Sequence, residues 1–121
     1  MCPQPTSDFE TAVLQWIAKS SGDSALQEQL AGALVVDREY TVVGCYSNLL
    51  VPMDSPASTA AYSNRGPLFG PSFMSKAVEH GGGTLLWFEA GRANCLEIFA
   101  YGDYFPADHA ELGEFKLLAG A

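Results

Sequence analysis

Glu97 and Asp103 are the residues whose types and spacing come closest to a catalytic pair. Two carboxylates held near each other can divide the roles of general acid and general base. The sequence shows no nucleophile, cofactor-binding loop or set of oxyanion donors that would complete such a site. The missing parts favour a protein that is not an enzyme, so we assign no catalytic residue and leave the question of enzyme activity open.

The cysteines and histidines do not supply the missing parts. Cys45 and Cys95 lie inside strand-like segments, where a thiol behaves as a small apolar group, and His80 and His109 are far apart. The glycine run 81–83 leads into a strand rather than a helix, unlike a phosphate-binding loop. The spacing of these residues therefore predicts neither a metal site nor a cofactor.

A predicted hairpin places Glu97 in an apolar setting. Ala90 and Gly91 form its turn, because glycine readily takes the positive φ of a short hairpin. Glu97 then lies opposite Thr84. The same face carries Leu86, Phe88 and Cys95. A carboxylate on such a face needs a partner, and the guanidinium of Arg38 suits a structural ion pair with Glu97; the alternative is an exposed Arg38.

Tyr46 and Trp87 offer another role for Glu97. The three side chains could line a pocket beneath the segment 52–83, in a small-molecule-binding domain or a weak enzyme. This is the alternative to the function predicted below.

An acidic and aromatic segment near the C-terminus resembles interface chemistry. No Lys or Arg lies between Gly102 and Phe115. Aromatic anchors with charges around them are typical of surfaces that bind a basic protein. The alternative is a solvated loop whose aromatic rings fold back on the core. The predicted partner-binding residues are Tyr101, Asp103, Tyr104, Phe105, Asp108 and Glu111.

Two helices are expected to begin the fold. Ser7 and Glu10 match a capping box, and apolar residues follow at helical spacing from Phe9 to Ile17. A second box at Ser24–Gln27 opens another helix. From Val35 the period changes to that of strands, with an extended run over 40–51 in which Tyr40 and Tyr46 share one face.

The second half is expected to be a loop, the hairpin and a short strand. Residues 52–83 are rich in Pro, Gly and Ser and predict a long irregular loop region. The hairpin follows, and 115–118 predict a last strand. The sequence therefore predicts one α+β domain over residues 1–121, with two N-terminal helices packed on a mainly antiparallel sheet.

Composition limits the function further. The chain has 121 residues, 6 Lys and Arg, 14 Asp and Glu, and a net charge of −8. Such a charge disfavours binding to nucleic acid or to an anionic membrane. No apolar run is long enough to span a bilayer, and the N-terminal residues show no signal peptide. Three cysteines without C-x-x-C spacing favour a reducing compartment, so we expect a cytoplasmic protein.

Two stretches resemble a family of small bacterial proteins. Residues 36–47 are similar to an Arg-Glu-x-Thr-Gly-Val-Gly-Phe-Tyr-Thr pattern, with Val42 where the pattern has Gly. The hairpin 87–103 with Pro106 is similar too, with Ala90 where Asp is usual. The resemblance implies an α+β fold, and some members resemble immunity proteins of bacterial toxin systems.

These observations predict a non-enzymatic, acidic, protein-binding domain. Its expected partner is another protein, and a basic toxin domain would make the chain an immunity-type inhibitor. A homodimer is left open.

Overall fold

The computed structural model describes residues 2–60, 66–102 and 104–119. Two helices, α1 (Asp8–Ser21) and α2 (Ser24–Ala31), precede most of the strands, and a 3₁₀ turn, η2 (His109–Leu112), comes near the end. The strands are β1 (Gln4–Pro5), β2 (Leu34–Tyr40), β3 (Gly44–Leu50), β4 (Leu68–Phe69), β5 (Ser72–Ser75), β6 (Val78–Glu89), β7 (Arg92–Ala100) and β8 (Phe115–Leu118).

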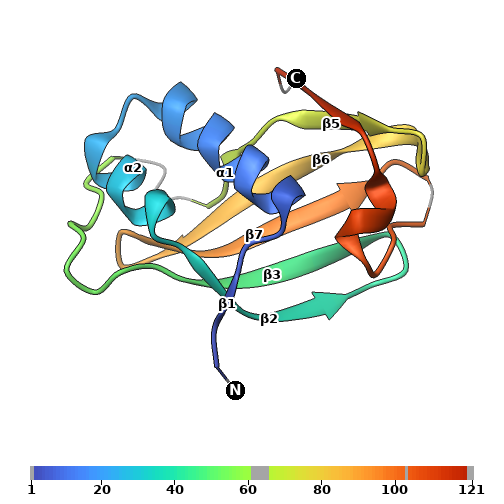
Figure 1. Cartoon of the computed structure of the whole chain (residues 1–121). Helices are drawn as coiled ribbons and strands as arrows, with labels where there is room; N and C mark the ends of the chain where they lie inside the picture. The colour runs from blue at the N-terminus through green and yellow to red at the C-terminus, as the bar shows by residue number, and fades with distance from the viewer. Residues whose placement is uncertain (1, 61–65, 103, 120–121) are drawn as a thin grey trace.

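One antiparallel sheet holds the eight strands of the described residues. Its order is β1-β2-β3-β7-β6-β5-β8, with β4 paired to β6. Figure 1 shows α1 and α2 on the same face of this sheet. The predicted α+β fold, with two N-terminal helices packed on an antiparallel sheet, is therefore confirmed.

Helix α1 begins where its capping box predicts. The Ser7 side chain accepts a hydrogen bond from the Glu10 backbone N–H, and the Glu10 side chain accepts one from the Ser7 N–H. Helix α2 begins differently, because Asp23, rather than Ser24, is its N-cap residue and accepts from the N–H groups of Ala25 and Leu26. Both caps satisfy backbone donors that the first helical turn leaves unpaired.

The core lies between the two helices and the sheet. Phe9 of α1 makes edge-to-face contacts with Phe73 of β5 at 5.0 Å and with Phe115 of β8 at 5.1 Å. Gln29 of α2 is also buried, and its amide bonds the carbonyl oxygens of Pro56 and Gly91 and the N–H of Ala93. This residue ties α2 to the turn of the β6–β7 hairpin.

The extended run expected over 40–51 is interrupted by a turn and contains only the second strand of a hairpin. Tyr40 ends β2, residues 41–43 turn the chain, and Gly44 starts β3. The reversal places Tyr40 opposite the buried Cys45, whereas Tyr46 points to the other side of the sheet. The two tyrosines therefore do not share a face, contrary to the sequence prediction.

The β6–β7 hairpin has the predicted turn but a different register. A β-bulge between Trp87 and Phe88 shifts the pairing, so that Glu97 lies opposite Leu85 instead of Thr84. A shift of one residue exchanges the two faces of a strand. Glu97 therefore lies on the face away from the helices, while Leu86 points into the core.

The predicted irregular region 52–83 is shorter than expected. It contains β4, β5 and the first residues of β6, including the glycine run 81–83. A Cβ on Gly82 would lie 2.1 Å from the Phe99 backbone oxygen, so glycine allows close approach of the strands here. The prolines and glycines of this region, which usually mark loops, conceal the two short strands β4 and β5.

Candidate functional site

The side chain of Glu10 is the most deeply buried charged group among the described residues. It is 0% exposed and lies on the core side of the sheet. Arg38 donates from Nη2 to Oε1 at 2.6 Å and from Nε to Oε2 at 3.0 Å. The Ser47 hydroxyl also donates to Oε2, and the Ser7 N–H donates to Oε1 at 2.8 Å. Four donors from three elements thus converge on one carboxylate.

These hydrogen bonds keep the Glu10 carboxylate ionised. Burial by itself would raise its pKa, but the hydrogen bonds from Arg38, Ser47 and Ser7 lower the pKa to about 2. The same ion pair raises the pKa of Arg38. Arg38 therefore has Glu10 as its carboxylate partner, and the expected pair between Arg38 and Glu97 is not formed, because the two residues lie on opposite faces of the sheet.

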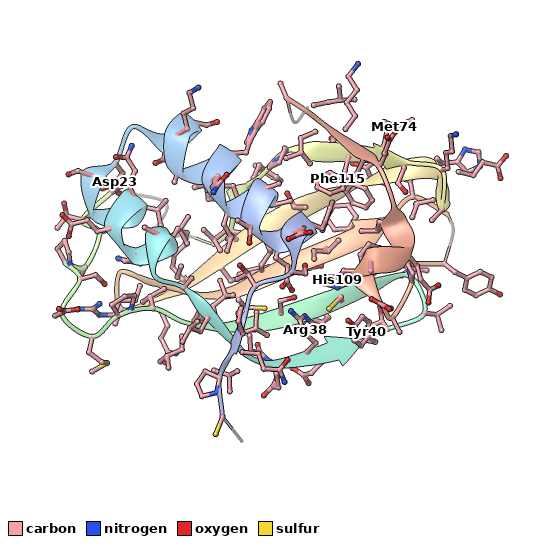
Figure 2. All side chains as sticks on the ribbon, viewed as in Figure 1. Asp23, Arg38, Tyr40, Met74, His109 and Phe115 are labelled. Carbon is pink, nitrogen blue, oxygen red and sulfur yellow. The ribbon has the colours of Figure 1, made fainter. Side chains whose placement is uncertain are left out.

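His109 completes this polar cluster, which comprises Ser7, Glu10, Arg38, Ser47 and His109. Its Nδ1 lies 2.8 Å from the Ser7 hydroxyl and 3.8 Å from Glu10 Oε2. Burial lowers the pKa of His109 and outweighs the opposite effect of Glu10. Figure 2 shows Arg38, Tyr40 and His109 together at the end of the molecule where α1 begins. They line a hollow of about 500 Å³.

The cluster does not have the geometry of a catalytic triad. In such a triad the nucleophile and the acid contact opposite ring nitrogens of the histidine. Here the Ser7 hydroxyl and the Glu10 carboxylate both face Nδ1, so His109 cannot pass a proton between them through its ring. The nearby Cys45 is buried, and this burial raises the pKa of its thiol, which disfavours the nucleophilic thiolate. The arrangement is that of a structural network.

Sequence reasoning missed Glu10 and Ser47 as members of this cluster. The capping box already accounts for a glutamate at position 10, and the structure confirms the box. The second role of Glu10, as the buried carboxylate of the cluster, is therefore not visible from the motif. The helical spacing did contain a signal. Glu10 precedes the buried Val13, Leu14 and Ile17 by three, four and seven positions, so it lies on the face of α1 that packs on the sheet.

The second candidate site is the open sheet face. This name denotes the side of the sheet opposite α1 and α2, and its central residues are Asp37, Glu39, Tyr46, Asn48, Phe69, Leu85, Trp87, Cys95, Glu97 and Phe99. Side chains of one strand alternate between the two faces, and residues directly opposite on paired strands share a face.

The central row of the open sheet face has an aromatic side chain between two acidic ones. Glu39 is opposite Tyr46, and Tyr46 is opposite Glu97 on the next strand. The row continues from Glu97 through Leu85 to Phe69. Tyr46 is 38% exposed and Trp87, in the adjacent row, is 37% exposed. Large rings are thus accessible beside carboxylates.

Two side chains hold these carboxylates in place. The Asn48 Nδ2 donates to Asp37 Oδ1 at 2.6 Å and to Glu39 Oε2 at 2.9 Å. The Trp87 indole Nε1 donates to Glu97 Oε1 at 2.9 Å. Each carboxylate is therefore oriented by a neutral donor, and none of the three forms a salt bridge among the described residues.

The alternative pocket of Tyr46, Trp87 and Glu97 is brought together by the structure, but on this open face. The hollow beside His109 is lined by other residues, as is one of about 480 Å³ between α1 and α2. Among the described residues, Tyr46, Trp87 and Glu97 therefore form part of a surface and line neither of these two hollows.

The predicted interface near the C-terminus is divided by the structure. Phe105 is 5% exposed and packs in the core against Phe9 and Phe73, so it is not available to a partner. Asp108 caps η2 by accepting from the Ala110 N–H. Tyr101, Tyr104 and Glu111 are exposed. The alternative interpretation, an aromatic ring folded back on the core, is correct for Phe105, and Asp103 lies outside the described residues.

The chain was compared with family models, curated proteins and solved structures. No family model matches the chain, and neither the curated proteins nor the solved structures include a significant match. Within the described part of the chain, no group of three His, Cys, Asp or Glu residues is placed to hold a metal ion. In the same part, no helix has the length and apolar character needed to cross a bilayer.

Proposed function

We propose that the chain is an acidic domain that binds a protein with a basic surface, and that it does so without catalysis. The observation that carries this proposal is the way its charges are distributed. The chain has fourteen acidic residues and only six basic ones. Two of the arginines are used inside the molecule: Arg38 pairs with Glu10, and Arg92 donates to the backbone oxygens of Pro52 and Met53. Negative charge is left to dominate the surface.

The same distribution supports a steering role for charge. Carboxylates of uniform sign raise the rate at which an oppositely charged partner meets the surface, while exposed aromatic rings provide the contact area that holds it. A basic toxin domain is a partner of this kind, so we propose an immunity-type inhibitor as the finer form of the function. Its free cysteines, Cys2, Cys45 and Cys95, suit the reducing cytoplasm that such an inhibitor would share with its target.

Partner capture followed by a salt titration tests this proposal. The tagged chain is used as bait in an extract of its source cell, retained proteins are identified, and the purified partner is titrated by calorimetry at 50 and 300 mM NaCl. We expect a basic partner whose Kd rises at least tenfold over that range. A partner that is neutral or acidic, a Kd independent of salt, or an extract that yields no specific protein would contradict the proposal.

A further inference from the structure

We infer that the partner docks on the open sheet face and places an arginine side chain over Tyr46, between the carboxylates of Glu39 and Glu97. This inference rests on the proposed function and adds to it the surface used and the chemical group recognised. It moves the interface away from the C-terminal segment, where the sequence placed it.

The geometry of the central row matches a guanidinium group. Directly opposite residues of paired strands have Cβ atoms about 5 Å apart, so Glu39 and Glu97 flank the Tyr46 ring at close range on both sides. A cation over the face of an aromatic ring is attracted by the ring, and the carboxylates add charge-assisted hydrogen bonds. Arginine combines both contacts, because its planar group stacks on a ring and presents several donors at its edge.

The carboxylates are already oriented before a partner arrives. Asn48 holds Glu39 and Asp37, and the Trp87 indole holds Glu97. Side chains that are fixed in advance lose less conformational entropy when they bind. Leu85, which follows Glu97 in the row, and Trp87, in the adjacent row, extend the apolar surface, so the arginine would be bordered by groups that exclude water.

Charge selects a basic partner over a second copy of this chain. In a symmetric dimer whose axis passes near Tyr46, the carboxylates of Asp37, Glu39 and Glu97 would meet the carboxylates of the other copy. Of the described arginines, Arg38 points to the core and Arg92 binds the segment 52–55. Lys116 shares the open side of the sheet with Met74, but it is on the edge strand β8, and β5, β6 and β7 lie between it and Tyr46. Like charges opposed at an interface disfavour association, so a dimer centred on Tyr46 would lack the counter-charge that a basic partner brings.

The test uses a defined peptide and nuclear magnetic resonance of the whole chain. A ten-residue peptide of alternating Arg and Thr is titrated into ¹⁵N-labelled protein in 50 mM NaCl, and a peptide with citrulline in place of Arg serves as a neutral probe of the same shape. We expect saturable shifts of the Trp87 indole N–H and of the Tyr46 and Glu97 amides with the arginine peptide. The citrulline peptide should bind at least tenfold more weakly.

Matched variants locate the binding. Glu39→Gln and Glu97→Gln should each weaken binding of the arginine peptide at least fivefold, whereas Glu28→Gln, on the exposed side of α2, should change it less than twofold. A spectrum of each variant with the dispersion of the parent shows that it is folded. Glu111→Gln tests the C-terminal segment directly.

Four results would overturn the inference. They are equal binding of the two peptides, no saturable binding, a loss of affinity in Glu111→Gln but not in the open-face variants, and self-association of the chain with shifts at Tyr46 and Trp87 on dilution. The partner capture described above is independent of these peptides. A captured basic protein that binds Glu39→Gln and Glu97→Gln as tightly as the parent would therefore leave the proposed function intact and reject the docking site.

Discussion

The carboxylates of Glu10 and Glu97 have opposite environments although both belong to regular elements. Glu10 has no solvent contact and receives hydrogen bonds from Arg38, Ser47 and Ser7. Glu97 is half-buried on the open sheet face and is bonded by the Trp87 indole. The sequence directed attention to Glu97, because the period of the hairpin placed it among apolar side chains, and a one-residue bulge was enough to move it to the other face.

At the scale of the residue, Glu10→Gln should lower the free energy of unfolding by about 3 kcal/mol. The substitution leaves the Arg38 guanidinium beside the core without its counter-charge, and breaking a buried pair typically costs about 3–5 kcal/mol. Glu97→Gln is the matched control and should cost less than about 1 kcal/mol, since it keeps an acceptor for the Trp87 indole. Urea unfolding of both variants makes the comparison. Equal losses of stability would contradict this assignment of roles.

At the scale of the element, the turn of the β6–β7 hairpin contains a strained residue. Ala90 has φ of 52° and Gly91 has φ of 79°, the pair of positive angles that a type I′ turn requires. A residue with a Cβ is disfavoured in this conformation by about 1–2 kcal/mol, and Asn tolerates it better than Ala. Gly91 cannot change, because a Cβ there would lie 2.7 Å from the Ser58 backbone oxygen.

Ala90→Asn should therefore raise the free energy of unfolding by about 0.5–1 kcal/mol. The reason is relief of strain at the first turn position, without any new contact to the rest of the fold. Ala77→Asn, at an exposed alanine outside the positive-φ region, is the control and should bring no gain. Thermal melts of the two variants measure the difference. A gain of the same size in both would show that the turn geometry is not responsible.

The elements that could be predicted from the sequence are those with local signals. The capping box at Ser7, the apolar spacing of α1, the turn at Ala90–Gly91 and the strand at 115–118 each depend on a few neighbouring residues. The features that the sequence did not predict depend on which strands pair with each other. The turn over 41–43 is made of Thr and Val, which favour strands, and β4 and β5 lie among prolines and glycines that usually mark loops. The convergence of Glu10, Arg38 and Ser47 needs three elements to be placed first.

At the scale of the whole molecule, stability should fall in two stages as the pH is lowered. Burial lowers the pKa of His109 in the fold, so below about pH 6.5 the unfolded chain binds the proton more strongly and folding weakens. The pKa of Glu10 is about 2 against an ordinary 4.5, so a second loss of about 3 kcal/mol follows between pH 4.5 and 2. Glu10, Arg38 and Asp108 are the charged groups that act on His109.

His109→Asn separates these two stages. The variant should be less stable at pH 7, because the contact with the Ser7 hydroxyl is altered, but its stability should change little between pH 7 and 5. The exposed His80 is present in both proteins and serves as an internal control. Urea unfolding at pH 7, 6, 5 and 4 gives the slopes. A parent protein whose stability does not fall between pH 7 and 5, or a variant with the same slope as the parent, would contradict this account.

The charge pattern of the whole molecule leads to the measurement that tests the central claim most directly. The claim is that the open sheet face binds a basic protein while the Glu10 cluster only stabilises the fold. The affinity of the purified basic partner is measured by calorimetry for the parent and for Tyr46→Ser, with thermal melts of both. We predict that Tyr46→Ser weakens binding at least tenfold and changes the melting temperature by less than about 3 °C. Unchanged affinity in this folded variant would contradict the claim.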